Sequence, residues 1–461
     1  MNKKTKLCIV GLGLHAKRAY LSKIDKYDID LALVIDLKKN EKTIKEYLLE
    51  KGFASTRTYF LEDEAADDIE LNEKYQKELS SILKEKGIMH AVISTEPKAH
   101  HAYLKFFIKN NINVLMDKPI FAFQGMIYDQ KAVALMDEKF KKMIDLYRRS
   151  DSKVYINCQR RYNDAYSLIK KEISSLIEKY NVGITNIDIV TNDGTWNMID
   201  EFFSRENHPY KYGYGKLLHS GYHFIDLLMY LLEENTKLKN KQINKISVKS
   251  SYISLKDYLE MIRPDEYDVL FNKSCEYAKY LDKDTSKMGE IDFSSIIEFK
   301  QDDNTLCLAS LNLLQSGFSK RSWTELPIDT YKGNGRVKQS YLSLNLGPLY
   351  SVKITANQGR FAYEEHGNKE EGYNDHFHVE IYRNSSLIGG EPFTSFDLSD
   401  LLVDNSLGYN EVFKERCFKD FILLNESECD LNKQINTMNL LSCLYRSARK
   451  EYIGGFKINE Q

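Results

Sequence analysis

Short apolar runs alternate with helical patterns over the first third of the chain. The apolar runs lie at residues 7–11, 31–35, 91–94 and 112–116, and helices are predicted at 14–24, 38–49 and 98–109. Apolar strands separated by helices are typical of a parallel sheet that helices cover on both faces. A helix at 130–148 and a strand at 154–158 lead out of this unit. The pattern therefore predicts an α/β fold with a doubly wound parallel sheet over residues 1–150.

The rest of the chain, residues 151–461, has the pattern of an α+β domain with a large, open, mostly antiparallel sheet. Strands are predicted at 185–191, 246–252, 294–299, 306–313 and 352–355, and a strong helix at 217–232. A helical insertion is expected near 256–290, and final helices at 409–450 are expected to pack back toward the N-terminal domain. An open sheet face must be covered, so we expect a homo-oligomer.

Composition excludes several classes of protein but does not identify a function. The 461 residues are too many for one core, and 65 basic against 67 acidic side chains give a net charge of −2. No nucleic-acid partner is expected from this balance, and no membrane partner, since no apolar run approaches ~18 residues. Seven cysteines without C-x-x-C spacing argue against a disulfide scaffold and a thiolate zinc site. We expect a cytoplasmic protein with no metal site.

A glycine-rich turn follows the first predicted strand. Gly11-Leu12-Gly13-Leu14-His15-Ala16 fits G-x-G-x-x-A and opens the first helix. Gly11 permits the tight turn, Gly13 lets the backbone approach a pyrophosphate, and Ala16 allows close helix packing. The helix N-terminus presents free N–H groups and a positive dipole end to phosphates. The turn therefore predicts a Rossmann dinucleotide site that includes Leu14 and His15.

An acidic residue at the end of the second strand strengthens this prediction. Asp36 stands where a carboxylate can accept hydrogen bonds from both ribose hydroxyls of a dinucleotide, and it would repel a 2′-phosphate. NAD is therefore the expected cofactor. Lys38 and Lys39 leave NADP as an alternative, because either side chain could reach a phosphate.

Two segments carry candidate catalytic side chains. Thr95 and Lys118 follow the ends of two predicted strands, at the edge where open α/β sheets bind ligands. A lysine there can donate to a hydroxyl or stabilise an alkoxide. On the helix at 217–232, His219, His223 and Asp226 are spaced to share one face, and a histidine suits proton transfer from a hydroxyl. For these histidines the alternatives to an acid/base role are a hydrogen-bonded histidine in the core and a two-histidine metal site.

Together these residues resemble the glucose-fructose oxidoreductase / inositol dehydrogenase / MocA family over nearly the whole chain. The shared features, in order, are the glycine turn, the Thr95-x-Pro97-x-x-x-His101 stretch, Asp117-Lys118-Pro119 in place of Glu-Lys-Pro, Arg160-Arg161-Tyr162, the glycine-rich run into His223 and Asp226, and Gly359. One departure is His219, where the family often carries an aspartate.

The resemblance implies a role for each of these positions. Lys118 would hydrogen-bond the reacting hydroxyl and His223 would be the general acid/base, which requires them to meet beside the nicotinamide. Thr95, Pro97, Asp117 and Lys118 would bind the cofactor, and the expected substrate ligands are Arg161, Tyr162, His219 and His223. The implied reaction is hydride transfer between NAD(P) and a hydroxyl or carbonyl carbon of a sugar, amino sugar, nucleotide sugar or cyclitol. An NAD-dependent glycoside hydrolase of the family and a degenerate, non-catalytic dinucleotide-binding protein are the alternatives.

Overall fold

The chain folds into two compact units, each assembled from separate segments. The computed structural model describes residues 4–206, 208–274, 276–280, 282–325, 335–358, 376–402 and 409–459, so Gly359 lies outside the described residues. The first unit comprises Met1–Phe123, Leu135–Asn163 and Ser406–Ile435. The second comprises Gln124–Ala134, Asp164–Asn405 and Asn436–Gln461.

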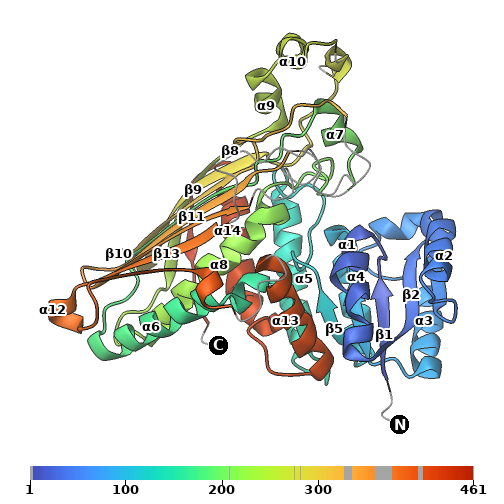
Figure 1. Cartoon of the computed structure of the whole chain (residues 1–461), viewed down its shortest axis with the longest axis horizontal. Coiled ribbons are helices and arrows are strands. Elements are labelled where there is room, and N and C mark those ends of the chain that lie inside the picture. Colours follow the sequence, from blue (N-terminus) through green and yellow to red (C-terminus); the bar gives the residue numbers. More distant parts are fainter. Residues whose placement is uncertain are drawn as a thin grey trace. The chain divides into compact units, whose positions relative to one another are not determined.

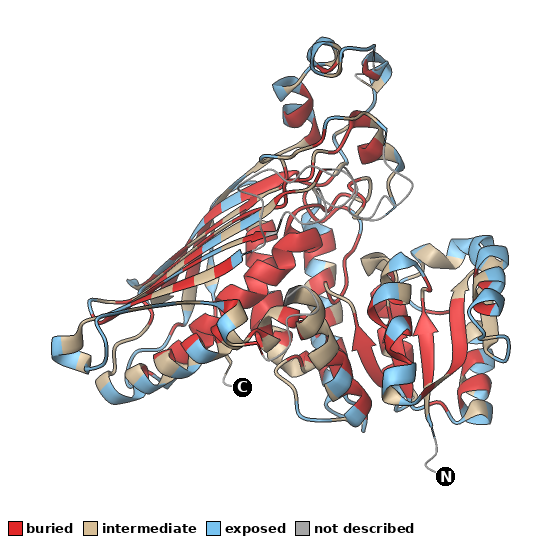
Figure 2. Ribbon diagram, viewed as in Figure 1, coloured by how far each residue is buried: buried red, intermediate tan, exposed pale blue. Residues whose placement is uncertain are grey.

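The first unit is built on a six-stranded parallel sheet in the order β3-β2-β1-β4-β5-β6 (Figure 1). Its central strands are mostly apolar and buried, as expected where helices cover both faces (Figure 2). The strand bounds are β1 Thr5–Val10, β2 Ile29–Leu37, β3 Arg57–Leu61, β4 His90–Ile93, β5 Asn113–Met116 and β6 Val154–Ile156.

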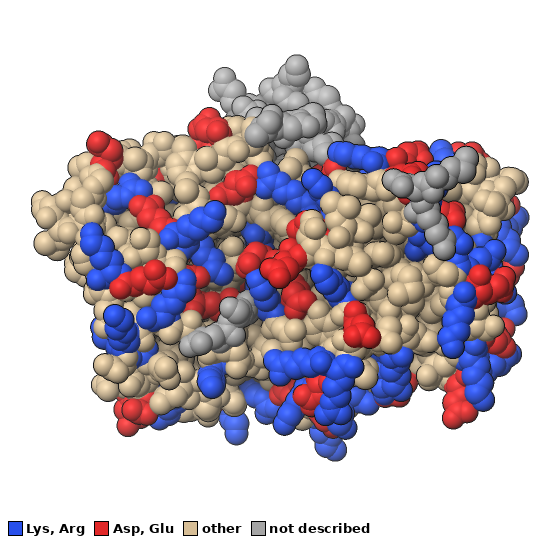
Figure 3. All heavy atoms as spheres, turned by 90° about the horizontal axis from the view of Figure 1, so that it is seen from below, with Lys and Arg blue, Asp and Glu red and all other residues tan. Residues whose placement is uncertain are grey.

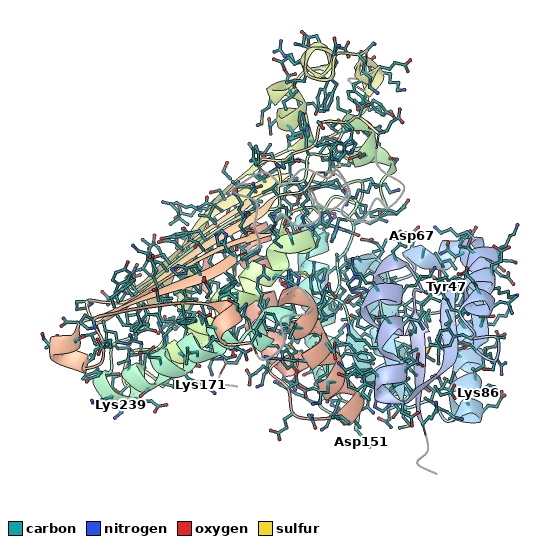
Figure 4. All side chains as sticks on the ribbon, in the orientation of Figure 1. Tyr47, Asp67, Lys86, Asp151, Lys171 and Lys239 are labelled. Atoms are coloured by element: carbon teal, nitrogen blue, oxygen red, sulfur yellow. The ribbon has the colours of Figure 1, made fainter. Side chains whose placement is uncertain are left out.

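The helices of this unit flank the sheet. They are α1 Leu14–Ala19, α2 Glu41–Glu50, α3 Glu73–Lys86, α4 Pro97–Lys109, α5 Gln130–Tyr147 and α13 Tyr409–Leu423, of which α5 begins in residues of the second unit. Helix α1 contacts α2 through the Lys17 ammonium, which lies 3.8 Å from the centre of the Tyr47 ring. Figure 4 labels Tyr47 on α2. Helix α1 is shorter than the predicted 14–24, because a 3-10 turn, Leu21–Lys23, follows it.

The second unit is built on a nine-stranded sheet in the order β14-β13-β12-β11-β7-β10-β9-β8-β15. Only the β7–β10 pair is parallel among these described strands. The bounds are β7 Asn186–Asn192, β8 Lys245–Ile253, β9 Asp292–Gln301, β10 Asn304–Leu314, β11 Lys338–Leu346, β12 Tyr350–Gln358, β13 His376–Arg383, β14 Phe393–Asp397 and β15 Tyr452–Gly455.

Helices pack on one face of this sheet, where α6 and α8 are visible in Figure 1. The helix bounds are α6 Asp164–Tyr180, α7 Ile199–Ser204, α8 Tyr222–Leu232, α9 Leu255–Met261, α10 Pro264–Phe271, α12 Ser385–Ile388 and α14 Ile435–Ser447. Helices α9 and α10 lie between β8 and β9, in the region near 256–290 where a helical insertion is predicted. With α7 they enclose a small aromatic core of their own.

The predicted fold class is confirmed: a parallel Rossmann-type sheet and a large, mostly antiparallel sheet. Within the described residues, no helix is long and apolar enough to cross a membrane. On the face shown in Figure 3, basic and acidic side chains are interspersed.

Candidate functional site

The glycine turn between β1 and α1 has the geometry that its sequence predicts. The Gly11 N–H donates to the Ile35 carbonyl at 2.9 Å, and Gly11 has a φ of +79°. A Cβ atom at Gly11 would lie 2.6 Å from the Ser94 carbonyl oxygen, so the β1 turn and the loop after β4 touch at this point. At Gly13, which precedes α1, a Cβ would meet no atom within 4 Å. The chain's own packing does not require that glycine, but the close approach of a phosphate would.

Asp36 is held against this turn by three donors. Its Oδ2 accepts the Leu12 N–H at 2.9 Å, and its Oδ1 accepts the Leu37 N–H and the Asn40 Nδ2, both at 2.7 Å. The side chain remains partly exposed. A carboxylate can accept about four hydrogen bonds, so capacity for a ribose hydroxyl remains. The contact with Leu12 therefore fixes the predicted ribose acceptor beside the predicted pyrophosphate site.

Lys38 and Lys39 both contact other acids, Lys38 through its ammonium and Lys39 only through its backbone N–H. The Lys38 ammonium lies 3.0 Å from Glu62 Oε1, and hydrogen bonding to Glu62 raises the pKa of Lys38. The Lys39 N–H donates to Asp63 at 3.0 Å. These contacts reduce the case for a 2′-phosphate partner at Lys38.

Asp117 is the centre of a polar network at the same edge of the sheet. Its carboxylate accepts hydrogen bonds from Tyr20 and from Ser94, the latter at 2.6 Å, and His15 Nε2 lies 3.4 Å away. Burial alone would raise the pKa of Asp117, but the His15 imidazole and the hydrogen bonds from Ser94 and Tyr20 outweigh it and hold that pKa below its usual range. The network joins the first turn of α1 to the ends of β4 and β5.

His100 links the two loops that carry Thr95 and Lys118. This fully buried side chain places Nδ1 2.9 Å from the Pro119 carbonyl oxygen and Nε2 3.0 Å from the Thr95 carbonyl oxygen. Pro97 begins α4 as its first residue. Lys118 is partly buried and precedes a cis bond to Pro119. The first unit thus brings the glycine turn, Asp36, Thr95, Asp117 and Lys118 to one edge of its sheet.

Arg161 and Tyr162 contact protein groups within the first unit. Arg161 is 1% exposed, and its guanidinium donates to the carbonyls of Glu428 at 3.2 Å and Lys433 at 3.0 Å. The Tyr162 hydroxyl donates to Asp420 at 2.6 Å. The pKa of Tyr162 is raised, and burial is the main cause. Through these contacts Arg161 holds the segment after α13, and Tyr162 contacts α13 itself. Their predicted contact with a substrate stays a prediction.

The predicted helix at 217–232 begins with a π-helical turn, Leu217–Gly221, which α8 continues. His223 lies in the first turn of α8 and is 8% exposed. π-Turns often occur at functional sites. A Cβ at Gly221 would lie 2.5 Å from the Lys216 carbonyl oxygen, so this tight packing requires a glycine.

His219 and Asp226 have different neighbours, although their spacing predicts one shared face. The His219 ring packs among those of His208, Tyr210 and Tyr214, with centroids 5.1, 5.0 and 6.1 Å away. Asp226 is fully buried, and its Oδ1 accepts the Thr437 hydroxyl of α14 at 2.9 Å. The π-turn breaks the regular 3.6-residue period on which the one-face prediction depends.

Two buried carboxylates hold the run that leads into the π-turn, and neither was expected from the sequence. Glu290 Oε1 accepts the Leu217 N–H at 2.9 Å, and Asp193 Oδ2 lies 2.7 Å from the Lys216 ammonium. A lysine inside the apolar run at 214–218 is a signal for a buried ion pair, and Asp193-Gly194 after β7 is a typical turn. For Glu290 the sequence carries no comparable signal.

Within the second unit, residues 124–134 pair with the segment that precedes the π-turn. The Gly125 N–H donates to the Tyr212 carbonyl at 2.9 Å, and the Ile127 N–H donates to the Gly213 carbonyl at 3.0 Å. A Cβ at Gly213 would lie 2.9 Å from Gly125, so the two segments are in close contact. This pairing fixes the position of the first residues of the glycine-rich run that continues to His223.

Comparisons with known proteins relate part of the chain to a family and the whole chain to a fold. Residues 6–143 match the model of the Gfo/Idh/MocA family, described as an oxidoreductase family with an NAD-binding Rossmann fold. No curated protein matches the sequence.

Solved structures with a similar fold span the whole chain at low identity. An aldose-aldose oxidoreductase from Caulobacter crescentus, complexed with glycerol, has a TM-score of 0.56 at 13% identity and covers 98% of this chain and 100% of its own. The WlbA dehydrogenase from Bordetella pertussis, in complex with NADH and UDP-GlcNAcA, has a TM-score of 0.55 at 14% identity with 99% of both chains covered. An oxidoreductase from Agrobacterium radiobacter, in complex with NAD+, L-tartaric acid and magnesium, has a TM-score of 0.54 at 11% identity with 99% of both chains covered.

The matched segment contains β1 to β5 and the glycine turn, so the family match and the observed fold describe the same part of the molecule. The chain is thus similar to the Gfo/Idh/MocA oxidoreductase family over residues 6–143, the part that forms the Rossmann-type sheet.

Proposed function

We propose that the protein transfers a hydride between NAD and a hydroxyl or carbonyl carbon of a sugar, amino sugar, nucleotide sugar or cyclitol. The observation that carries this proposal is the turn at Gly11 with Asp36 hydrogen-bonded to its Leu12 N–H. It presents a phosphate-binding helix end and a ribose acceptor side by side. The bound dinucleotide would supply the hydride acceptor or donor, and the chain's residues would bind, orient and handle the proton.

Two side chains are assigned to the substrate hydroxyl. The Lys118 ammonium, at the edge of the first sheet, donates a hydrogen bond to the reacting oxygen and stabilises negative charge on it. His223, at the start of α8, accepts the hydroxyl proton during oxidation and returns it during reduction. This assignment rests on the chemistry of the two groups and on the family resemblance.

NAD rather than NADP is the proposed cofactor. Asp36 would place its negative charge next to a 2′-phosphate, and the Lys38 ammonium is engaged with Glu62. Both contacts disfavour the additional phosphate. The structures from Agrobacterium radiobacter and Bordetella pertussis, which contain NAD+ and NADH respectively, are consistent with this choice.

The test is a turnover assay at the absorbance band of the reduced nicotinamide. Sugars, amino sugars, nucleotide sugars and cyclitols are offered with NAD or NADP to the wild type and to His223→Ala. We expect NAD-dependent turnover that falls roughly 10²–10⁴-fold in the variant, the usual cost of losing general acid/base help. The dissociation constant for NAD, measured by calorimetry, should be unchanged.

Other outcomes would favour the alternative functions. Cleavage of a glycoside without net NADH formation would indicate a hydrolase that uses NAD for transient oxidation. Biological activity that survives both Lys118→Ala and His223→Ala would indicate a non-catalytic dinucleotide-binding protein and refute the proposal.

We propose that a second copy of the chain packs on the open face of the nine-stranded sheet. Alternate side chains on β9, β10 and β11 point away from the helices, and Ile296, Leu308 and Tyr341 are 56%, 45% and 37% exposed. Ile296 and Leu308 lie on adjacent, paired strands. Light scattering of Ile296→Lys/Leu308→Lys should show a smaller assembly than the wild type, and an unchanged mass would contradict this assignment.

A further inference from the structure

One buried carboxylate in the second unit contacts side chains at both ends of the π-turn. Asp193, in the loop after β7, lies 2.7 Å from the ammonium of Lys216, the residue before the turn, and it accepts a hydrogen bond from Ser220 within the turn. The Lys216 ammonium also donates to the Ser220 hydroxyl at 2.9 Å. Each of the three side chains therefore contacts the other two, and all three are buried.

The loop that carries Asp193 is itself held by the chain that enters β11. Arg336 donates from Nη2 to the Asp193 carboxylate at 2.9 Å and from Nε to the Asp193 carbonyl at 3.1 Å. A Cβ at Gly194 would lie 1.9 Å from the Val337 carbonyl oxygen, so the two segments are in close contact. Burial alone would raise the pKa of Asp193, but the neighbouring cations, Lys216 first, outweigh it and hold that pKa well below its usual range. Asp193 is therefore a charged and immobilised anchor for the π-turn.

The geometry of the π-turn decides the direction of the side chains that follow it. The Gly221 N–H donates to the Lys216 carbonyl at 2.9 Å, five residues back, where an α-helix would pair residues four apart. One extra residue in the turn changes the direction of every later side chain by about 100° relative to a continuous α-helix. His223 is the second residue of α8, directly after the turn. The direction of its imidazole therefore depends on whether the turn stays π-helical.

A second buried contact fixes the chain on the other side of His223. The carboxylate of Asp226 accepts the Thr437 hydroxyl of α14 at 2.9 Å. Ser220 and Asp226 stand three residues before and three residues after His223. The imidazole thus lies between two polar anchors, and the one at Ser220 holds the π-turn.

We infer that Asp193, Lys216 and Ser220 are positioning residues for His223, because they hold the π-turn and thereby set the direction of the imidazole. The ion pair anchors the start of the turn, and the Ser220 hydroxyl ties the end of the turn to that pair. The three residues act through His223 and not on the substrate. This inference rests on the proposed function for the role of His223 as acid/base.

Ser220→Ala tests the inference with little risk to the fold, because the 2.7 Å pair between Asp193 and Lys216 remains. Ser295→Ala is the matched control, since Ser295 of β9 is also buried and its hydroxyl meets no hydrogen-bond partner among the described residues. The full-length protein is labelled with ¹³C at histidine Cε1 for NMR, and His223→Gln assigns the His223 signal. We expect Ser220→Ala to displace or broaden that signal and Ser295→Ala to leave it at its wild-type position.

Two further readouts separate a local displacement from a general loss of structure. The signals of the histidines in the first unit should not move in Ser220→Ala, and the dissociation constant for NAD should be unchanged, because the glycine turn lies in that unit. In the turnover assay, kcat of Ser220→Ala should fall roughly 10–100-fold, since a small displacement of a group that transfers a proton is costly.

An unchanged His223 signal in Ser220→Ala, or an equal change in Ser295→Ala, would overturn the inference. A displaced signal with wild-type kcat would overturn it as well. Because the NMR experiment requires no substrate, a displaced His223 signal without any NAD-dependent reaction would keep the link between Ser220 and His223 and remove the proposed function instead.

Discussion

The buried carboxyl of Glu290 gives a pH-dependent contribution to stability that a single substitution can isolate. Glu290 is 0% exposed, its Oε1 accepts the Leu217 N–H at 2.9 Å and the Tyr445 hydroxyl at 3.3 Å, and its Oε2 meets no hydrogen-bond partner among the described residues. Burial raises the pKa of Glu290 from 4.5 to about 7. Protonation therefore favours the folded state, and its stabilising effect is complete below pH 4.5 and lost as the pH rises through 7.

The size of the effect follows from the shift in pKa. The difference between a pKa of 4.5 and one of about 7, at about 1.4 kcal/mol for each pH unit, gives about 3 kcal/mol between acidic pH and pH 8.5. Glu290→Gln keeps the acceptor for Leu217 and removes the titration. The free energy of unfolding of Glu290→Gln minus that of the wild type should therefore increase by about 3 kcal/mol from pH 4.5 to pH 8.5.

Urea unfolding at several pH values measures this difference. Glu298→Gln is the matched control, because Glu298 is only partly buried and hydrogen bonding to Lys300 lowers its pKa. The free energy of unfolding of Glu298→Gln minus that of the wild type should not increase from pH 4.5 to pH 8.5. A difference between Glu290→Gln and the wild type that is independent of pH would refute the reasoning.

Three further predictions concern single residues. Asp36→Ala should weaken NAD binding roughly 10–100-fold, by loss of charge-assisted hydrogen bonds, and reduce the preference over NADP, which calorimetry with both dinucleotides can measure. Gly11→Ala should abolish NAD binding, because a Cβ there meets the Ser94 carbonyl at 2.6 Å and φ is +79°; retained binding would mean that the turn can rearrange. Lys216→Met should destabilise the protein by about 3 kcal/mol or more in urea unfolding, since it leaves Asp193 buried without its nearest cation. A loss under 1 kcal/mol, about that of an exposed ion pair, would contradict that role.

The local motifs were predictable because adjacent residues determine them. Short-range patterns predict the turn at Gly11, the strand that ends near Asp36 and the helix that begins with the π-turn. Neither strand β3 nor helix α3 was predicted. In β3 only Leu61 is fully buried, so this edge strand lacks the apolar run that identified its neighbours.

Long-range polar pairings could not be predicted from the sequence. Arg161 donates to a carbonyl 272 positions away, and Arg336 to a carboxylate 143 positions away. Periodicity indicates which face of an element is buried, but not which polar group it meets there. The two buried carboxylates that hold the π-turn were missed for the same reason.

The proposed hydride transfer is best tested by a crystal structure of the protein with NAD and a substrate that it turns over. We expect the Lys118 ammonium and the His223 imidazole both to lie within hydrogen-bonding distance of the substrate oxygen whose carbon faces the nicotinamide. Either side chain directed away from that oxygen, or a dinucleotide seated elsewhere than on the Gly11 turn, would contradict it.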